Sequence, residues 1–170
     1  TVTRSRRLVV SSISTIGNYV YGFFWYFYMD GTIGVEVKAT GFPFPSALEN
    51  GRASPYGRQI GDQVESHVHQ HVFSFRFDMA LDGERNSVSE MNFRPAPTGP
   101  DNPHGNAVIT EETRFSTESE AQREIDSRQS RYWRVINPGV LNRFGEPVGY
   151  KLLPGANSFP LQHPDSSVGR

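Results

Sequence analysis

The stretch from Tyr19 to Met29 carries eight aromatic side chains in eleven positions, and Asp30-Gly31 follows it directly. Aromatic residues favour extended strands, and each buries a large area, so this run needs two covered faces or one large partner surface. Asp-Gly between extended segments predicts a tight hairpin, because a type I′ turn needs positive φ at both central residues. We therefore expect Tyr19–Met29 to fold back against Thr32–Thr40.

Other segments also read as strands separated by turns. Asp82-Gly83 predicts a second hairpin, in which His67–Leu81 folds against Glu84–Phe93. Two further strands are expected at Arg131–Ile136 and Val148–Leu153. No internal repeat is found.

Turn-forming segments and one predicted helix lie between or after these strands. Thr117 and Glu120 have the spacing of a capping box, which predicts one short helix over 117–125. Three segments rich in Gly, Pro, Ser or Asn are predicted to be irregular, namely 42–62, 95–106 and the tail after Pro154. The sequence thus predicts a mainly β fold, an antiparallel β-sandwich or part of one, with one short helix.

Composition excludes several classes of function. With 170 residues the chain can bury a core as one ordinary domain, and its formal net charge of -1 gives no reason to expect a nucleic acid or an anionic membrane as partner. It contains no cysteine, which removes disulfides, thiolate ligands and a cysteine nucleophile. The longest apolar run is shorter than the roughly 20 residues that span a bilayer.

Residues 67–81, "HVHQHVFSFRFDMAL", alternate so that three histidines share a strand face with apolar side chains. They could be histidines buried in a core, or His69 and His71 could bind one metal ion, since neighbours on a strand face lie roughly 6.5–7 Å apart. His67 is the weaker candidate ligand, because about 13 Å of unbroken strand separates it from His71. Imidazole ligands alone suit copper, zinc or iron.

The order of several segments resembles the catalytic domain of the copper-containing primary-amine oxidases. The segments that carry the resemblance are "TRSRRLVVSSISTIGNYVYGFFWYFYMDGTIGVEVKATG", "HQHVFSFRFDMALDG", "ESEAQREIDSRQSRYWRVINP" and "NRFGEPVGYKLLP". The resemblance implies that Tyr19 is the precursor of the cofactor topaquinone and that Asn18 helps to hold the quinone ring. It also implies that His69 and His71 are two of three copper ligands.

The resemblance further implies an enzyme that oxidises primary amines to aldehydes and releases hydrogen peroxide and ammonia. The chain departs from the family pattern at Val20, where the family carries an acidic residue, and position 20 has the opposite strand parity to Tyr19. The family's third copper histidine lies further downstream and its catalytic aspartate further upstream. Residues 1–170 are therefore expected to form a single catalytic-domain portion, truncated at both ends relative to the family.

Two alternatives to amine oxidation by this chain remain open from the sequence. A stand-alone relative could bind a hydrophobic small molecule, or promote a cyclisation or isomerisation without a cofactor. A purely structural subunit could use the aromatic strand as an interface. The expected partners are accordingly a primary amine or another hydrophobic small molecule, with no nucleic acid or membrane, and a second copy in a homodimer or a complementing chain.

Overall fold

The computed structural model describes residues 2–48, 51–52, 54–155 and 157–167. It divides into two compact units, with the boundary between His71 and Val72. The described residues form three antiparallel sheets and one 3-10 helix. The predicted mainly β, antiparallel class is therefore confirmed.

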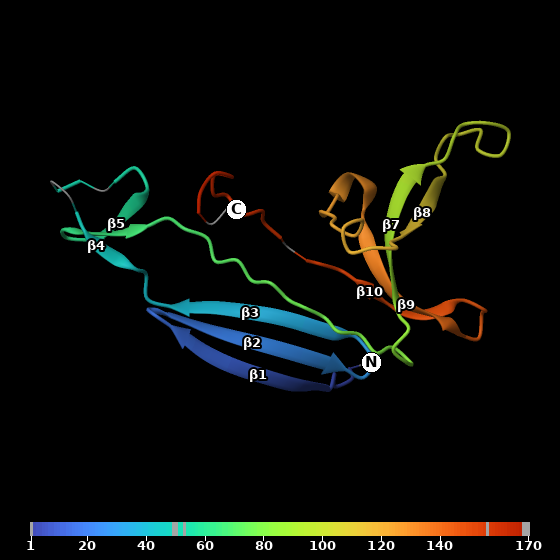
Figure 1. Ribbon diagram of the computed structural model, residues 1–170, viewed down its shortest axis with the longest axis horizontal. Coiled ribbons are helices and arrows are strands. Elements are labelled where there is room, and N and C mark those ends of the chain that lie inside the picture. The colour runs from blue at the N-terminus through green and yellow to red at the C-terminus, as the bar shows by residue number, and fades with distance from the viewer. Residues whose placement is uncertain (1, 49–50, 53, 156, 168–170) are drawn as a thin grey trace. The chain divides into compact units, whose positions relative to one another are not determined.

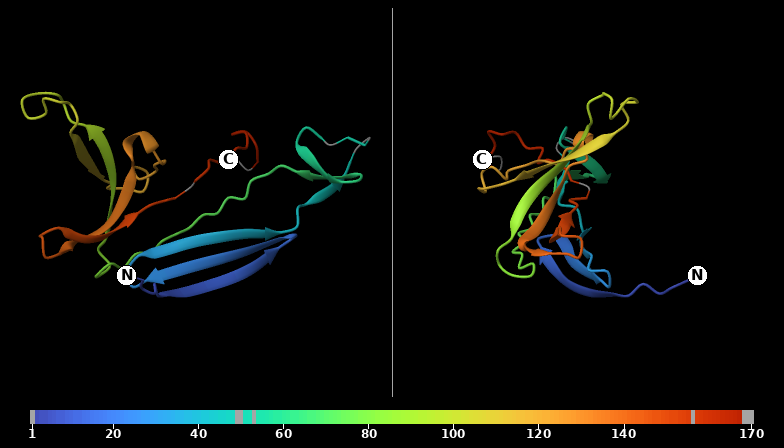
Figure 2. Two further views of the ribbon diagram at one scale, coloured as in Figure 1. Left: turned by 180° about the vertical axis from the view of Figure 1, so that it is seen from behind. Right: turned by 90° about the vertical axis from the view of Figure 1, so that its right-hand side faces the viewer.

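The first unit contains a three-stranded sheet of order β1-β2-β3, drawn in blue in Figure 1 and seen from behind in Figure 2. Its strands are β1 (Arg7–Ile16), β2 (Tyr19–Tyr28) and β3 (Ile33–Gly41). The predicted hairpin of β2 and β3 is confirmed. Its turn is a three-residue loop and not a type I′ turn, because Gly31 has a positive φ, of 86°, and Asp30 does not. The N–H of Tyr28 donates to the carbonyl of Thr32 and closes this loop.

The aromatic strand β2 lies in the middle of this sheet. A two-residue loop, Gly17-Asn18, joins it to β1, with Ile16 paired to Tyr19. Gly17 has φ 59° and Asn18 does not have a positive φ, which is the pattern of a type II′ turn. This loop puts Tyr19 at the first position of β2.

A small second sheet of order β4-β6-β5 completes the first unit. Its strands are β4 (Pro45–Ala47), β5 (Gly57–Gly61) and β6 (Val64–His67). The prediction that 42–62 is irregular is thus wrong for two short strands, while positions 49–50 and 53 lie outside the described residues. The strands form although the segment is rich in turn residues, because each pairs with β6.

The second unit contains a four-stranded sheet of order β10-β9-β7-β8 (Figure 1). Its strands are β7 (Ser87–Pro95), β8 (Val108–Arg114), β9 (Tyr132–Leu141) and β10 (Pro147–Leu152). The strands predicted at 131–136 and 148–153 are confirmed as β9 and β10. Ile136, Ser89 and Met91 are buried in this sheet.

The predicted hairpin around Asp82-Gly83 is wrong. Residues 68–81 belong to no strand, and β7 pairs with β8 and β9 instead. The turn itself forms, with φ 47° at Asp82 and with the side chain of Asn86 accepting from the N–H of Leu81. Alternation specifies the two faces of an extended segment but not its hydrogen-bonding neighbour, which explains the difference.

The helix predicted over 117–125 is also wrong, because only one turn forms there. The capping contact is present, since Thr117 Oγ1 accepts from the N–H of Glu120. However, every residue of this segment is exposed except Ala121, which is half-buried. A short helix without a buried apolar face is unstable in water. The described helix, 3-10 in type, is Ser127–Gln129, and no described helix is long and apolar enough to cross a membrane.

Candidate functional site

Two tyrosines and two histidines meet on one face of β2 in the first unit. Tyr19 and Tyr21 are two positions apart on the strand, so both side chains point to the same face. His69 and His71 follow the end of β6 and repeat the same spacing. Tyr19 contacts His69 and Tyr21 contacts His71, each pair fifty residues apart, so the histidine segment runs in the same direction as β2.

The distances in this cluster are those of direct polar contacts. The Oη of Tyr19 lies 2.9 Å from the Nε2 of His69, and that nitrogen lies 2.8 Å from the Nε2 of His71. The Oη of Tyr21 lies 2.6 Å from the Nδ1 of His71. The rings of Tyr19 and His71 meet edge to face with their centroids 4.6 Å apart.

The backbone fixes the orientation of His69. Its Nδ1 lies 2.8 Å from the carbonyl oxygen of His67, an atom that can only accept a hydrogen bond. The Nδ1 therefore carries the proton, and the Nε2 of the neutral ring presents a lone pair towards His71. A second hydrogen bond of this kind is what orients histidines that ligate metals.

His67 contributes this carbonyl, while its imidazole turns elsewhere. Its Nε2 lies 3.3 Å from Glu65 Oε1 and 3.4 Å from Ser46 Oγ. Glu65 is buried and accepts from the backbone N–H of Ser54 at 2.7 Å. That hydrogen bond, followed by the neighbouring His67, lowers the pKa of Glu65 below its usual range. The pair therefore anchors β6, from which the histidine segment leaves.

The backbone at the start of β2 is tightly packed against the end of β3. The N–H of Phe42 donates to the carbonyl of Asn18 at 2.8 Å, and the side chain of Asn18 donates to the carbonyl of Pro43 at 3.4 Å. Gly41 pairs with Tyr19 and has φ 109°, and a Cβ at Gly41 would lie 2.8 Å from the Cα of Tyr19. Glycine is required where backbones approach this closely.

The two converging Nε2 atoms fit a copper ion. Metal–nitrogen bonds of about 2.0 Å that meet at a right angle, as in tetragonal Cu(II) sites, separate the nitrogens by about 2.8 Å. The observed separation is 2.8 Å. In the part of the chain that the structure describes, no group of three or more His, Cys, Asp or Glu side chains is arranged to hold a metal ion.

The remaining histidines, His104 and His163, both belong to the second unit. His104 lies in the turn between β7 and β8, and His163 lies beside Asp165, with its Nδ1 3.5 Å from the carboxylate. Tyr21 is the member of the cluster that the sequence analysis did not single out. Its strand parity with Tyr19 and its distance of fifty positions from His71 are the signals that could have found it.

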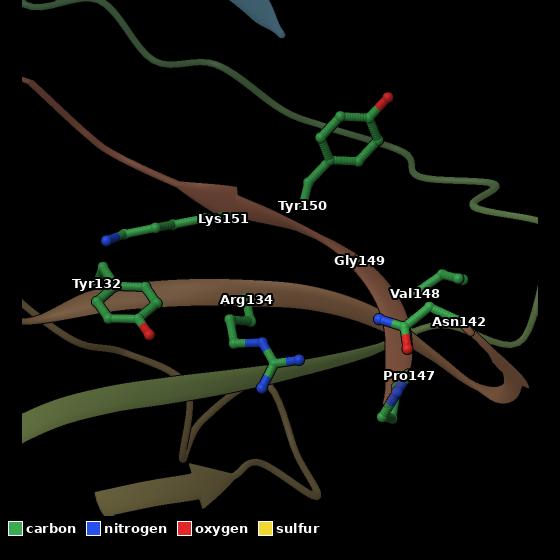
Figure 3. Close-up of a pocket in the computed structure, with 8 residues that line it drawn as sticks. All are labelled: Tyr132, Arg134, Asn142, Pro147, Val148, Gly149, Tyr150 and Lys151. Carbon is green, nitrogen blue, oxygen red and sulfur yellow. The ribbon is translucent and has the colours of Figure 1, made fainter. Parts of the chain in front are cut away.

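A shallow groove of about 440 Å³ lies on β9 and β10 in the second unit (Figure 3). Its polar groups are mainly cationic or phenolic, and the ammonium of Lys151 lies 3.9 Å from the centroid of the Tyr132 ring. None of the predicted site residues lines it. The lining residues are Tyr132, Arg134, Asn142, Pro147, Val148, Gly149, Tyr150 and Lys151.

Known proteins resemble this chain over nearly its whole length. The histamine oxidase of Arthrobacter globiformis is 47% identical over 98% of the chain, and a copper-containing peroxisomal diamine oxidase of Nicotiana tabacum is 44% identical over 99%. The crystal structure of a copper-containing benzylamine oxidase from Hansenula polymorpha matches 96% of the chain with a TM-score of 0.86 and 30% identity.

The chain spans only part of these relatives. It covers 24% of the histamine oxidase, 22% of the diamine oxidase and 26% of the benzylamine oxidase chain. The family model described as "Copper amine oxidase, enzyme domain" matches residues 1–170. The chain therefore belongs to the copper amine oxidase family, within the enzyme domain.

Proposed function

We propose that Tyr19 is the tyrosine that becomes topaquinone and that His69 and His71 are two of the copper ligands of a primary-amine oxidase. The reaction would convert a primary amine to an aldehyde and release hydrogen peroxide and ammonia. One observation carries the proposal: the phenol oxygen of Tyr19 lies 2.9 Å from an imidazole nitrogen that is itself 2.8 Å from a second imidazole nitrogen. The names of the relatives, a histamine oxidase and a copper-containing diamine oxidase, support this class of substrate.

When bound, copper makes a phenol reactive towards dioxygen, and the quinone offers an electrophilic carbonyl to an amine. The residues of this chain position that chemistry. His69 and His71 present their Nε2 atoms to the same point, and β2, paired on both sides, holds Tyr19 beside them. Asn18 fixes the loop that precedes Tyr19 through its contacts with Phe42 and Pro43.

Further groups would come from outside these residues. Proton abstraction from the α-carbon of an amine needs a general base, and the family resemblance assigns that role to an aspartate upstream of Tyr19. The third imidazole ligand would likewise come from a downstream segment. We infer that residues 1–170 supply a portion of one catalytic domain, and that the enzyme works as a homodimer.

The proposal is tested by loading the protein with Cu(II) in air and measuring the mass of the peptide that contains Tyr19. We expect a quinone-staining peptide and a mass change at Tyr19, neither of which occurs in Tyr19→Phe. Tyr28→Phe is the matched control, because Tyr28 lies on the same strand and contacts Arg7, not the histidines. Copper-loaded protein in which Tyr19 stays unmodified would contradict the proposal.

A further inference from the structure

The two histidines of the site differ in the partners of their Nδ1 atoms. The Nδ1 of His69 faces the carbonyl of His67, so His69 is held in one tautomer. The Nδ1 of His71 faces the hydroxyl of Tyr21 at 2.6 Å. A phenol hydroxyl can either donate or accept a hydrogen bond, so this partner suits both tautomers of His71.

Without a cation, the contact between the two rings requires a proton on one Nε2 atom. His69 Nε2 carries a lone pair, so the Nε2–H of His71 donates to it across 2.8 Å, and the Tyr19 hydroxyl approaches the same nitrogen at 2.9 Å. The Nδ1 of His71 then carries a lone pair and accepts from the hydroxyl of Tyr21. Every polar atom of His71 is satisfied in this state.

A bound metal ion requires the opposite tautomer of His71. Both Nε2 atoms must offer lone pairs, so the proton of His71 has to sit on Nδ1. The oxygen of Tyr21 can then accept from that N–H, and its own hydroxyl hydrogen rotates away. The total number of protons on the two rings and the phenol is the same in both states.

We propose that Tyr21 is a positioning residue that lets His71 exchange its tautomer when the metal binds, whereas His67 locks His69 in the ligating form. This inference rests on the proposed function, because it concerns the same metal site. Burial supports it: Tyr21 is only 8% exposed, whereas His71 is exposed, and the contact between them is partly buried. Deleting the hydroxyl therefore leaves the Nδ1 of His71 without this partner on the buried side.

The expected effect is a loss of metal affinity. Removing the hydrogen-bond partner of a ligating histidine typically weakens binding ten- to a hundredfold. We expect this increase in the dissociation constant for Zn(II), measured by chelator competition, in Tyr21→Phe. Tyr28→Phe removes a hydroxyl from the same strand that contacts Arg7, and it should bind Zn(II) as the unmodified protein does.

Nitrogen NMR of ¹⁵N-histidine-labelled protein reads the tautomers directly and does not depend on the variant folding. We expect His69 to keep its proton on Nδ1 with and without Zn(II), and His71 to move its proton from Nε2 to Nδ1 on Zn(II) binding. An unchanged tautomer of His71, or equal Zn(II) affinity in Tyr21→Phe, would overturn the role of Tyr21 while leaving the metal site intact. Absence of Zn(II) binding in the unmodified protein would overturn this inference and the proposed metal site together.

Discussion

Gly41→Ala should disturb the site through the neighbouring strand β3, and its cost has two parts. Gly41 pairs with Tyr19 and has φ 109°, a region that costs a non-glycine residue about 1–3 kcal/mol. Its new Cβ would also lie 2.8 Å from the Cα of Tyr19 and 3.0 Å from the N of Val20. The nearest neighbour is the carbonyl oxygen of Asn18, and because all three neighbours are backbone atoms, relief requires the start of β2 to move, for about 1–3 kcal/mol more.

Gly31→Ala is the matched control for this substitution. Gly31 lies at the other end of the same hairpin with φ 86°, and a Cβ there would have no atom within 4 Å. It should therefore show only the conformational part, of about 1–2 kcal/mol. The difference in unfolding free energy between the two variants isolates the contacts with the backbone of residues 18–20, and we expect about 1–3 kcal/mol.

Urea unfolding followed by tryptophan fluorescence measures this difference. In a Trp133→Phe background the fluorescence comes from Trp25, which lies on β2. Zn(II) affinity should fall in Gly41→Ala and stay unchanged in Gly31→Ala, since only the first displaces Tyr19. Equal losses of stability, with equal metal affinity, would refute the argument that the close approach at Gly41 holds the site together.

Two further outcomes concern buried carboxylates. Glu90→Gln should lower the unfolding free energy of the second unit by about 1–3 kcal/mol, because it removes the buried carboxylate that pairs with the half-buried guanidinium of Arg131. Glu111→Gln, at an exposed pair, should cost less than about 1 kcal/mol in the same urea titration. The N–H of Ser54 favours the ionised form of Glu65 and lowers the pKa of this carboxyl in the folded state. The contribution of Glu65 to the stability of the first unit should therefore be fully present above the ordinary glutamate pKa of about 4.3. It should be lost as the pH falls through the lower folded-state pKa. Glu65→Gln should flatten this dependence, and an identical acid profile in that variant would contradict it.

The strands that the sequence predicted carry stronger local signals than the strands that it missed. The hairpin of β2 and β3 was predictable because aromatic density and Asp30-Gly31 are local features. The missed strands are β1, β8 and the three short strands of the second sheet, and all of them except β6 are edge strands. β8 reads "VITEETR", and charged residues of this kind are common on edges, where they prevent unwanted pairing. The formation of such strands depends more on pairing with the neighbouring strand than on alternating apolar and polar residues in their own sequence.

The site was predictable to different degrees for each residue. Alternation placed His69 and His71 on one face, which the convergence of their Nε2 atoms matches. Periodicity could not distinguish Tyr19 from the other aromatic residues of its strand, and only the family resemblance singled it out. The contribution of His67 could not be read from its side chain, because the atom that contacts His69 is a backbone carbonyl.

The arrangement of the four side chains has a common physical origin in the period of two along an extended chain. Tyr19 and Tyr21 are two positions apart on β2, and His69 and His71 are two positions apart on the segment that contacts it. The two segments run in the same direction. Each tyrosine therefore meets its own histidine, and the histidines meet each other. A shift of one residue in either segment would turn both of its rings to the opposite face. Two contacts prevent such a shift. Gly41 packs against the backbone of Tyr19, and Glu65 holds the end of β6. Both are therefore needed for the arrangement of the four rings.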